Sequence, residues 1–429
     1  MTQGKKLKIG LLGAGTVGAG VIKALINHPY VEIKKIGVKD LNKKRDLPKE
    51  INGRLPLLTT DLNEIVGDPE IEIIVEVLGG LSPTKEIVVS AIKNNKHIVT
   101  ANKDLIATYG AELFSLAKDK NVQIQFEASV CGGIPIINTL KQTLSANKFS
   151  KIVGILNGTT NYILSEMLSK NISFEKALKD AQDKGYAEPN PANDISGKDA
   201  AYKLAILGSI AFGERINIGE LYTEGIEKIS LIDIIHAEEL GYRLKLIGFA
   251  RREKDKKIDL RVHPAFIKKP NPLASVSGAN NGILVEGDLV GELTLIGQGA
   301  GQNPTASSIV GDINLLVAQL SYSRNPHPQF VCHHTNYASI KPIQETENCY
   351  FLRVKAEDKA GVVGQLGTIC GKYNVSINAL TQRGVSPDGS ATITLLTHCV
   401  KEGDMQSAIS EIKKANTIKQ IENMIRVLE

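Results

Sequence analysis

Short apolar runs alternate with helix-period segments over the first part of the chain. The apolar runs predict strands at Leu7–Leu12, Ile33–Val38, Ile71–Val77, His97–Val99 and Val122–Phe126. Between them, apolar residues recur with the helical period at Thr16–Asn27, Thr84–Asn95 and Ala111–Lys120. This alternation is typical of a parallel, doubly wound α/β sheet. We therefore expect residues 1–135 to form a doubly wound domain, completed by a helix at about 305–320.

From about residue 136 the pattern becomes irregular, which is typical of an α+β domain. Strands are expected at 151–156 and on both sides of the charged run 251–257, which we interpret as a hairpin tip. Helices are expected at Thr160–Leu168, at Phe174–Lys184 and at about 197–212. We assign residues 136–304 to this second domain.

The last part of the chain predicts a separate unit. Residues 321–348 have no clear period and contain three prolines, so we interpret them as a linker that lets this unit move. Residues 349–429 then give the order of a ferredoxin-like unit, strand–helix–strand–strand–helix–strand, with a short last strand. These elements are expected at 350–356, 362–373, 375–383, 390–398, 403–415 and near the end.

Composition and charge limit the function classes. The 429 residues carry a formal net charge of only +5, without a dense basic stripe, so no nucleic-acid partner is expected. No apolar run is long enough for a membrane helix, and the start shows no signal peptide, so we expect no membrane partner. The five cysteines are scattered without a CxxC pair, so neither a disulfide framework nor a zinc site is expected. A reducing cytoplasm is the expected location.

A glycine motif follows the first predicted strand and precedes a helix. Gly13-x-Gly15-x-x-Gly18, with Thr16 and Val17 inside it, has the spacing of a Rossmann-type dinucleotide site. Glycines allow the backbone to approach a pyrophosphate, and the N-terminus of the helix favours its negative charge.

Charged residues after the second predicted strand bear on the choice of cofactor. Asp40 is an acid that could bind a ribose, whereas Lys39, Lys43, Lys44 and Arg45 could hold a 2′-phosphate. We favour NADP, with NAD as the alternative. The alternative for the charges themselves is a solvated loop.

Two further groups of polar residues point to chemistry. Thr100, Asn102 and Lys103 follow a strand, at the edge where doubly wound sheets bind ligands. The stretch GYAEPNPANDISGKDAAYKLAIL at 185–207 places Asp199 four residues before Lys203, on one helical face. Two simpler interpretations stay open for Asp199: a capping box with Ser196, and a surface ion pair with Lys203.

The motifs together resemble homoserine dehydrogenase. GAGTVG at 13–18, TANK at 100–103, NGTTNYIL at 157–164, the stretch at 185–207 and GQGAGQNPTAS at 297–307 carry the resemblance. Residues 350–380 resemble an ACT domain, although Ala360-Gly361 replaces the usual Pro-Gly pair. This sequence departs from the family pattern at Asn190 and Asn193, where the family often has aspartates. The resemblance implies interconversion of L-aspartate 4-semialdehyde and L-homoserine with NAD(P)H, in threonine, methionine and isoleucine biosynthesis.

The resemblance also implies roles for individual residues. Lys203 is the expected proton donor, with Asp199 and Lys103 as the other catalytic residues. The expected substrate residues are Asn157, Gly158, Thr159, Glu188, Asp194, Asp199 and Lys203. The expected cofactor residues are Gly13, Gly15, Thr16, Val17, Gly18, Lys43, Arg45, Thr100, Lys103, Gly185, Glu188 and Gly301.

Two further ligands follow from the resemblance alone. A monovalent cation, most simply sodium, is expected at the Glu127 carboxylate and the carbonyl groups of Val130, Gly132 and Ile134. The ACT domain is expected to sense L-threonine, with Asn378 as a contact, or else to serve only dimerisation. A homodimer or homotetramer is expected. The alternative functions are another NAD(P)-dependent amino-acid oxidoreductase and a non-catalytic NADP-binding regulator.

Overall fold

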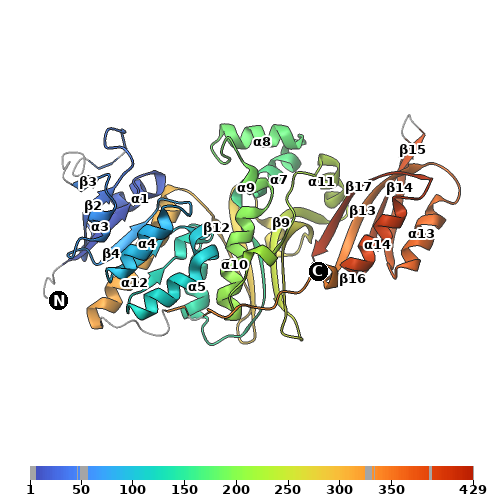
Figure 1. Cartoon of the computed structure of the whole chain (residues 1–429). Helices are drawn as coiled ribbons and strands as arrows, with labels where there is room; N and C mark the ends of the chain where they lie inside the picture. Colours follow the sequence, from blue (N-terminus) through green and yellow to red (C-terminus); the bar gives the residue numbers. More distant parts are fainter. Residues whose placement is uncertain are drawn as a thin grey trace. The chain divides into compact units, whose positions relative to one another are not determined.

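The computed structural model describes residues 6–45, 47–48, 57–323, 331–332, 334–385 and 389–428. They form two compact units, each built from three stretches of chain (Figure 1). The first unit comprises Met1–Ile152, Tyr202–Gly219 and Leu284–Ala338, and the second comprises Val153–Ala201, Glu220–Ile283 and Ser339–Glu429. The chain passes from one unit to the other within β7 (Phe149–Ile155), α10 (Lys198–Phe212) and β11 (Asn280–Gly287).

The first unit contains a parallel sheet with the strand order of a Rossmann fold. Its six strands lie in the order β3-β2-β1-β4-β5-β6, and the recorded pairs are all parallel. The order reverses between β1 and β4, and ligands of such sheets bind beyond the strand ends at this point. The strands are β1 (Leu7–Leu12), β2 (Val31–Gly37), β3 (Leu58–Thr59), β4 (Ile73–Glu76), β5 (His97–Thr100) and β6 (Ile124–Gln125). The predicted α/β class is confirmed.

Helices from distant parts of the sequence share the core of this unit. Helix α1 (Thr16–Leu25) packs against α12 (Gln302–Tyr322). Ile309 and Leu316 of α12 belong to the same buried cluster as Ile9 of β1 and Val21 of α1. The other crossover helices are α3 (Asn63–Val66), α4 (Thr84–Lys93) and α5 (Lys103–Asp119). Strand β12 (Gly291–Gln298) also belongs to this unit.

The second unit carries a long hairpin and the helices that surround the substrate motif. The hairpin joins β9 (Tyr242–Arg252) to β10 (Ile258–Lys268), with the predicted charged run at its tip. The short strand β8 (Tyr222–Thr223) pairs in parallel with β10. The helices are α7 (Gly158–Lys170), α8 (Phe174–Asp183), α9 (Ala192–Ile195) and α11 (Leu231–Glu239).

The C-terminal module, residues 347–428, has the predicted ferredoxin-like order. Its strands lie in the order β17-β13-β15-β14, and α13 and α14 lie on one side of the sheet (Figure 1). Val354 and Ile393 of the sheet share a buried core with Leu366 and Ile409 of the helices. The elements are β13 (Glu347–Glu357), α13 (Val362–Lys372), β14 (Ile377–Val385), β15 (Ser390–Thr397), β16 (Val400–Lys401), α14 (Glu402–Ile412) and β17 (Ile418–Leu428).

One expectation about this module, a short last strand, is wrong. The last strand, β17, has 11 residues, and it pairs with β13 on one side and with β10 over Ala265–Ile267 on the other. The described part of the segment 321–348 is also paired, since Lys341 N donates to Ile258 O at 2.8 Å. The module is therefore joined to the hairpin by strand pairing. The segment before it forms an isolated bridge to Ile258, which the absence of a hydrophobic period did not reveal. Residues 324–330 and 333 lie outside the described residues.

The structure contains one disulfide that the sequence did not indicate. Cys349 and Cys399, separated by 50 positions in the sequence, form a disulfide within the C-terminal module. The sheet brings the start of β13 beside the segment after β15, which spacing in the sequence does not reveal. Cys131, Cys332 and Cys370 are buried and do not take part in a disulfide. Among the described helices, none has the length and apolar character that a membrane span needs.

Candidate active site

The turn between β1 and α1 is built for close approach of a ligand. Gly13 has φ +107°, and a side chain at Gly18 would place Cβ 2.1 Å from the Gly13 carbonyl oxygen. An added Cβ at Gly15 meets no atom within 4 Å. The turn therefore needs glycine at 13 and 18 for its own geometry, while Gly15 faces open space. A pyrophosphate can approach the backbone at that point.

A cavity of about 810 Å³ lies in front of this turn. It is bounded by Gly13, Gly15 and Thr16, by Val77 and Leu78 after β4, and by Gln302 at the start of α12. Gln302 Nε2 donates to the Thr16 carbonyl at 3.0 Å. Sequence reasoning missed Gln302, although it stands next to the expected Gly301, which has φ +121° before α12.

Positive side chains line the far part of the cavity. Lys39, Lys43, Lys44 and Arg45 all belong to its lining, together with Asp40. The Asp40 carboxylate accepts from Asn42 N at 2.8 Å, and Arg45 NH1 donates to Lys43 O at 2.8 Å. Asp40 is thus engaged in its own turn, whereas several cations surround the space where a ribose substituent would lie.

A buried acid orders the ends of β4 and β5. Glu76 is fully buried, burial raises its pKa, and it accepts hydrogen bonds from Leu78 N and Thr100 Oγ1. Asn102 caps α5 by accepting from Leu105 N at 3.0 Å, so Lys103 is the first residue of that helix. The sequence analysis did not single out Glu76. Its signal is an acid at the end of an otherwise apolar strand.

Asn157 brings two aspartates of the substrate motif together. Its Nδ2 donates to Asp194 Oδ1 at 2.7 Å and to Asp199 Oδ2 at 2.8 Å. Its Oδ1 accepts from Thr160 N at 2.8 Å and so caps α7. Two carboxylates on one amide donor concentrate negative charge, and an ammonium group is suited to neutralise it. Gly158 lies beside them in the first turn of α7.

The loop that follows α8 is tied to the same place. Thr159 Oγ1 donates to the Tyr186 carbonyl at 2.7 Å. Gly185 has φ +75°, and the exposed Glu188 follows it in this loop. Both residues lie in the second unit with Asn157, Asp194 and Asp199, whereas Lys203, Gly13 and the cavity lie in the first.

Helix α10 carries the candidate acid and the candidate proton donor. It begins at Lys198, after Gly197 with φ +82°. Asp199 is buried, with 8% of its surface exposed, and it accepts a hydrogen bond from Asn157. It therefore does not lie on the surface, as an exposed ion pair with Lys203 would require. The surface-pair interpretation is therefore not supported. Lys203 lies one turn further along the same helix, on the same face as Asp199.

Glu127 lies in a buried acidic pocket of the first unit. Its carboxylate oxygens accept from Ile137 N at 2.8 Å and Asn138 N at 2.6 Å. Asp312 of α12 accepts from Glu127 N at 2.8 Å. Burial, then the charge of Asp312, raises the pKa of Glu127 to about 7, and burial raises that of Asp312 to about 6.

The expected cation ligands lie in the segment that begins at Glu127. Val130, Gly132 and Ile134 lie in the loop after Glu127, where Cys131 and Gly132 have φ values of 54° and 45°. Two carboxylates are buried together here, with the Lys141 charge lowering the pKa of each against the larger effect of burial, and oxygen donors suit a hard cation. Among the described residues, no group of three or more His, Cys, Asp or Glu side chains could hold a metal, so backbone oxygens would have to complete the site.

Asn378 lies in the C-terminal module on β14, the last strand of its sheet. It is exposed, and the register with β15 shifts between Ile377 and Ala379. A bulge of this kind turns a side chain away from regular pairing. Gly361, at the start of α13, has φ +92°.

Comparison with known proteins covers the whole chain. The family profile described as homoserine dehydrogenase matches residues 135–314, its NAD binding domain matches 13–127, and the ACT domain matches 350–416. A homoserine dehydrogenase of Synechocystis sp. is 44% identical, covering 98% of this chain and 99% of the relative. The solved homoserine dehydrogenase of Thiobacillus denitrificans has a TM-score of 0.93 at 40% identity, covering 99% of both chains.

A second similar structure was solved with a cofactor bound. It is a hyperthermophilic archaeal homoserine dehydrogenase in complex with NADPH. It has a TM-score of 0.62 at 28% identity and covers 75% of this chain and 100% of its own.

Proposed function

Because the chain belongs to the homoserine dehydrogenase family, we propose that Lys203, Asp199 and Lys103 carry out its reaction. The chain is an NAD(P)-dependent oxidoreductase that reversibly reduces L-aspartate 4-semialdehyde to L-homoserine. The match over the full length leaves no support for a non-catalytic regulator or for a different amino-acid oxidoreductase. The roles of individual residues are the proposal.

The acid–base chemistry falls to the lysines. When bound, the reduced nicotinamide supplies the hydride that reaches the aldehyde carbon. The Lys203 ammonium donates a proton to the developing alkoxide oxygen and takes it back in the reverse reaction. Asp199, one helical turn away, keeps Lys203 protonated and oriented. Lys103, at the start of α5, stabilises the same oxygen by its charge.

The substrate's amino-acid end is held by the second group of residues. Asp194 and Glu188 bind the α-ammonium group, while Asn157, Gly158 and Thr159 at the start of α7 receive the α-carboxylate. The observation that carries this proposal is the double contact of Asn157 Nδ2 with Asp194 and Asp199. It concentrates the acids of the motif at the start of the helix that bears Lys203.

Replacement of Lys203 tests the central role. We expect Lys203→Ala to lower kcat by about 10²–10⁴-fold, the usual contribution of a general acid. The Kd for the cofactor should change little, because the glycine turn belongs to different elements. Initial rates at 340 nm and fluorescence titration with NADPH measure the two quantities. A variant that keeps more than about a tenth of the wild-type kcat would exclude Lys203 as the proton donor.

The cofactor preference is proposed to be NADP, with NAD as a second substrate. Support comes from the cationic lining of the cavity and from the NADPH complex of the archaeal relative. Gly13, Gly15, Thr16, Val17 and Gly18 hold the pyrophosphate at the start of α1, and Gly301 borders it through Gln302. Thr100, Gly185 and Glu188 are proposed to complete the nicotinamide side.

A sodium ion is proposed at Glu127, with carbonyl oxygens of Val130, Gly132 and Ile134. Support comes from the two carboxylates of Glu127 and Asp312, which are buried together so that burial raises the pKa of each. The cation would hold the loop that follows β6, residues 127–134, beside α12. It takes no part in the proton transfer.

The remaining proposals concern the setting of the enzyme. We place it in threonine, methionine and isoleucine biosynthesis in the cytoplasm, with L-threonine as effector at Asn378. A homodimer or homotetramer is supported by apolar side chains exposed near β12, namely Leu289 at 72% and Ile296 at 52% exposure.

A further inference from the structure

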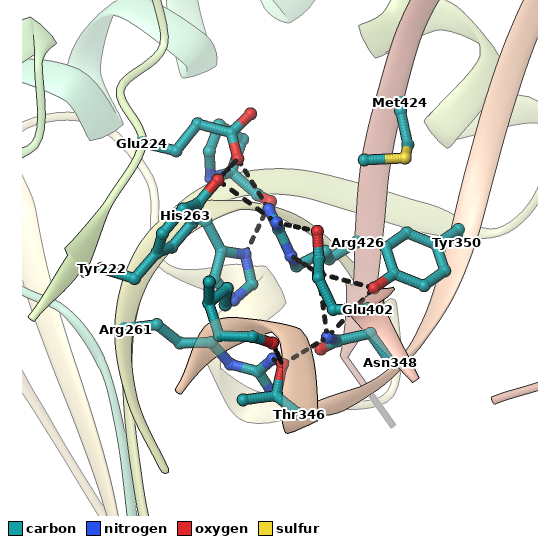
Figure 2. Close-up of polar contacts among 12 residues, drawn as sticks. Tyr222, Glu224, Arg261, His263, Thr346, Asn348, Tyr350, Glu402, Met424 and Arg426 are labelled. Carbon is teal, nitrogen blue, oxygen red and sulfur yellow. Dashed lines mark hydrogen bonds and ion pairs between the residues drawn. The ribbon is translucent and has the colours of Figure 1, made fainter. Parts of the chain in front are cut away.

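A buried polar network occupies the second unit around Arg426 of β17 (Figure 2). Arg426 is only 2% exposed. Its Nε and NH2 donate to the two carboxylate oxygens of Glu402, at 3.0 and 2.8 Å. Burial opposes ionisation of Glu402, but the Arg426 charge holds its pKa below the usual value. A bidentate pair of this kind fixes the plane of the guanidinium.

The C-terminal module supplies the residues that hold Glu402. Tyr350 OH donates to Glu402 Oε2 at 2.6 Å, and Gln406 Nε2 donates to Oε1 at 2.8 Å. Asn348 Nδ2 lies 3.4 Å from the same carboxylate. The orientation of Arg426 is therefore set from the module.

The free side of the guanidinium contacts the segment that follows β8. Arg426 NH1 donates to Glu224 Oε2 at 2.6 Å. Tyr222 OH donates to the same oxygen at 3.0 Å, and the Tyr222 ring lies 5.0 Å from the guanidinium carbon. Figure 2 shows Arg426 between Glu402 on one side and Glu224 with Tyr222 on the other.

The segment 224–226 in turn packs on the substrate motif, backbone against backbone. Ile226 N donates to the Ile195 carbonyl at 2.8 Å. A Cβ at Gly225 would lie 2.1 Å from Ile195 O and 2.6 Å from Ser196 Cα. A Cβ at Gly197 would lie 3.2 Å from the Thr223 methyl carbon. No space is left for these segments to shift independently.

Ile195 ends α9, which carries Asp194, and the turn from Ile195 to Gly197 leads into α10, which carries Asp199. We propose that Arg426 is a positioning residue for homoserine: through Glu224 it fixes segment 224–226, which holds this turn and so places both aspartates against Asn157. The inference rests on the proposed substrate role of Asp194 and Asp199. It assigns a role in the reaction to a side chain of the C-terminal module.

The Glu224→Gln variant tests this link with little risk to folding. The Glu224 side chain is 33% exposed, and glutamine keeps its shape while the charge is lost. We expect KM for homoserine to rise about tenfold, as for loss of one charged hydrogen bond. KM for NADP should stay within about twofold of wild type, because the glycine turn is untouched. Arg426→Lys should give a smaller rise, since lysine keeps a single contact.

Hydrogen exchange gives a readout that does not depend on turnover. The Ile226 amide is bonded to Ile195 O, so it should exchange faster in Glu224→Gln than in wild type. Peptides from the glycine turn at 13–18 should be unchanged. An unchanged exchange rate at Ile226 would overturn the proposal.

The matched control is Glu422→Gln in the same strand as Arg426. Glu422 pairs with the other buried arginine of the module, Arg353, and is 25% exposed. Arg353 binds Asp233 of α11. The control should leave KM for homoserine within about twofold of wild type. An equal rise in both variants, or none in Glu224→Gln, would overturn the proposal. Loss of turnover in Asp199→Ala with a normal KM in Glu224→Gln would reject the link and leave the proposed site intact.

Discussion

At the scale of residues, we expect the choice between NADP and NAD to depend on side chains that follow β2. Lys43 and Arg45 line the cavity while the Asp40 carboxylate is engaged in its own turn. We expect the double variant Lys43→Ala, Arg45→Ala to weaken NADP binding by about 10–100-fold, because charged hydrogen bonds to a 2′-phosphate are lost. NAD binding should change much less. Titration with both cofactors measures the effect.

The control for this prediction is Lys35→Ala, which removes a charge from β2 at a residue that is not part of the cavity lining. It should affect both cofactors equally and weakly. An equal loss of NADP and NAD binding in the double variant would mean that Lys43 and Arg45 belong to a solvated loop and do not bind the 2′-phosphate.

Glu127 provides a second prediction at this scale. Sodium that binds only the folded protein raises the free energy of unfolding by RT ln(1 + [Na⁺]/Kd). We expect NaCl to raise the Tm of the wild type above its value in choline chloride at equal ionic strength. Glu127→Gln should lose this difference, because the carboxylate ligand is gone. A sodium effect that persists in Glu127→Gln would contradict the proposed site.

Lys245 predicts a pH dependence that has no connection with turnover. It is buried, donates to Asn161 Oδ1 at 2.9 Å and to Val276 O at 2.6 Å, and burial, then the Arg243 charge, lowers its pKa to about 8. Between pH 8 and the usual 10.5, the unfolded chain binds more protons at this group than the folded chain. The contribution of Lys245 to the free energy of unfolding therefore rises with pH in this window.

Comparison with Lys245→Met isolates this contribution. The free energy of unfolding of the wild type, relative to the variant, should increase by about 2–3 kcal/mol from pH 7.5 to pH 10.5. Urea denaturation at several pH values measures it. A difference that is constant across the window would mean that Lys245 titrates normally.

At the scale of elements, the sequence predicted the existence of helices and strands better than their ends. Strand β1 and the start of α1 match the prediction, because a glycine turn separates them. Helix α5, however, begins at Lys103 and not at Ala111. Its first half contains Gly110, which weakens the helical signal. A Cβ there would lie 2.6 Å from the Arg215 guanidinium, which donates to the Ile106 and Ala107 carbonyls.

Some parts of the candidate site could be predicted from the sequence and others could not. The glycine turn and its charged neighbours are close in sequence, so local reasoning could place them together. Asn157 and Asp199 are 42 positions apart, and Glu127 and Asp312 are 185 apart, so only the family resemblance could join the first pair and nothing indicated the second. Glu224 and Arg426 carry no motif. Their pairing depends on β8 and β17 both lying beside β10.

At the scale of the molecule, the C-terminal module is part of a longer sheet in the second unit. Strand β17 pairs with β13 of the module along most of its length and with β10 of the hairpin over Arg426–Leu428, so the module and the hairpin share one sheet. A ligand of the module can therefore act only by changing how this sheet and its side chains are arranged. The free energy by which the ligand shifts the equilibrium between two such arrangements cannot exceed the difference between its binding free energies for them.

The last prediction applies this argument to L-threonine. Asn378 is exposed at a bulge of β14, at the opposite edge of the module sheet from β17. Coupling between distinct sites is typically about 1–3 kcal/mol, so saturating threonine should weaken homoserine binding by about 5–150-fold. Asn378→Ala should raise the threonine concentration needed for inhibition, whereas Ser407→Ala on α14 should not. Initial rates and calorimetry with the full chain measure both. Absence of heat at millimolar threonine, with unchanged rates, would mean that the module stabilises the sheet and pairs with another copy without sensing threonine.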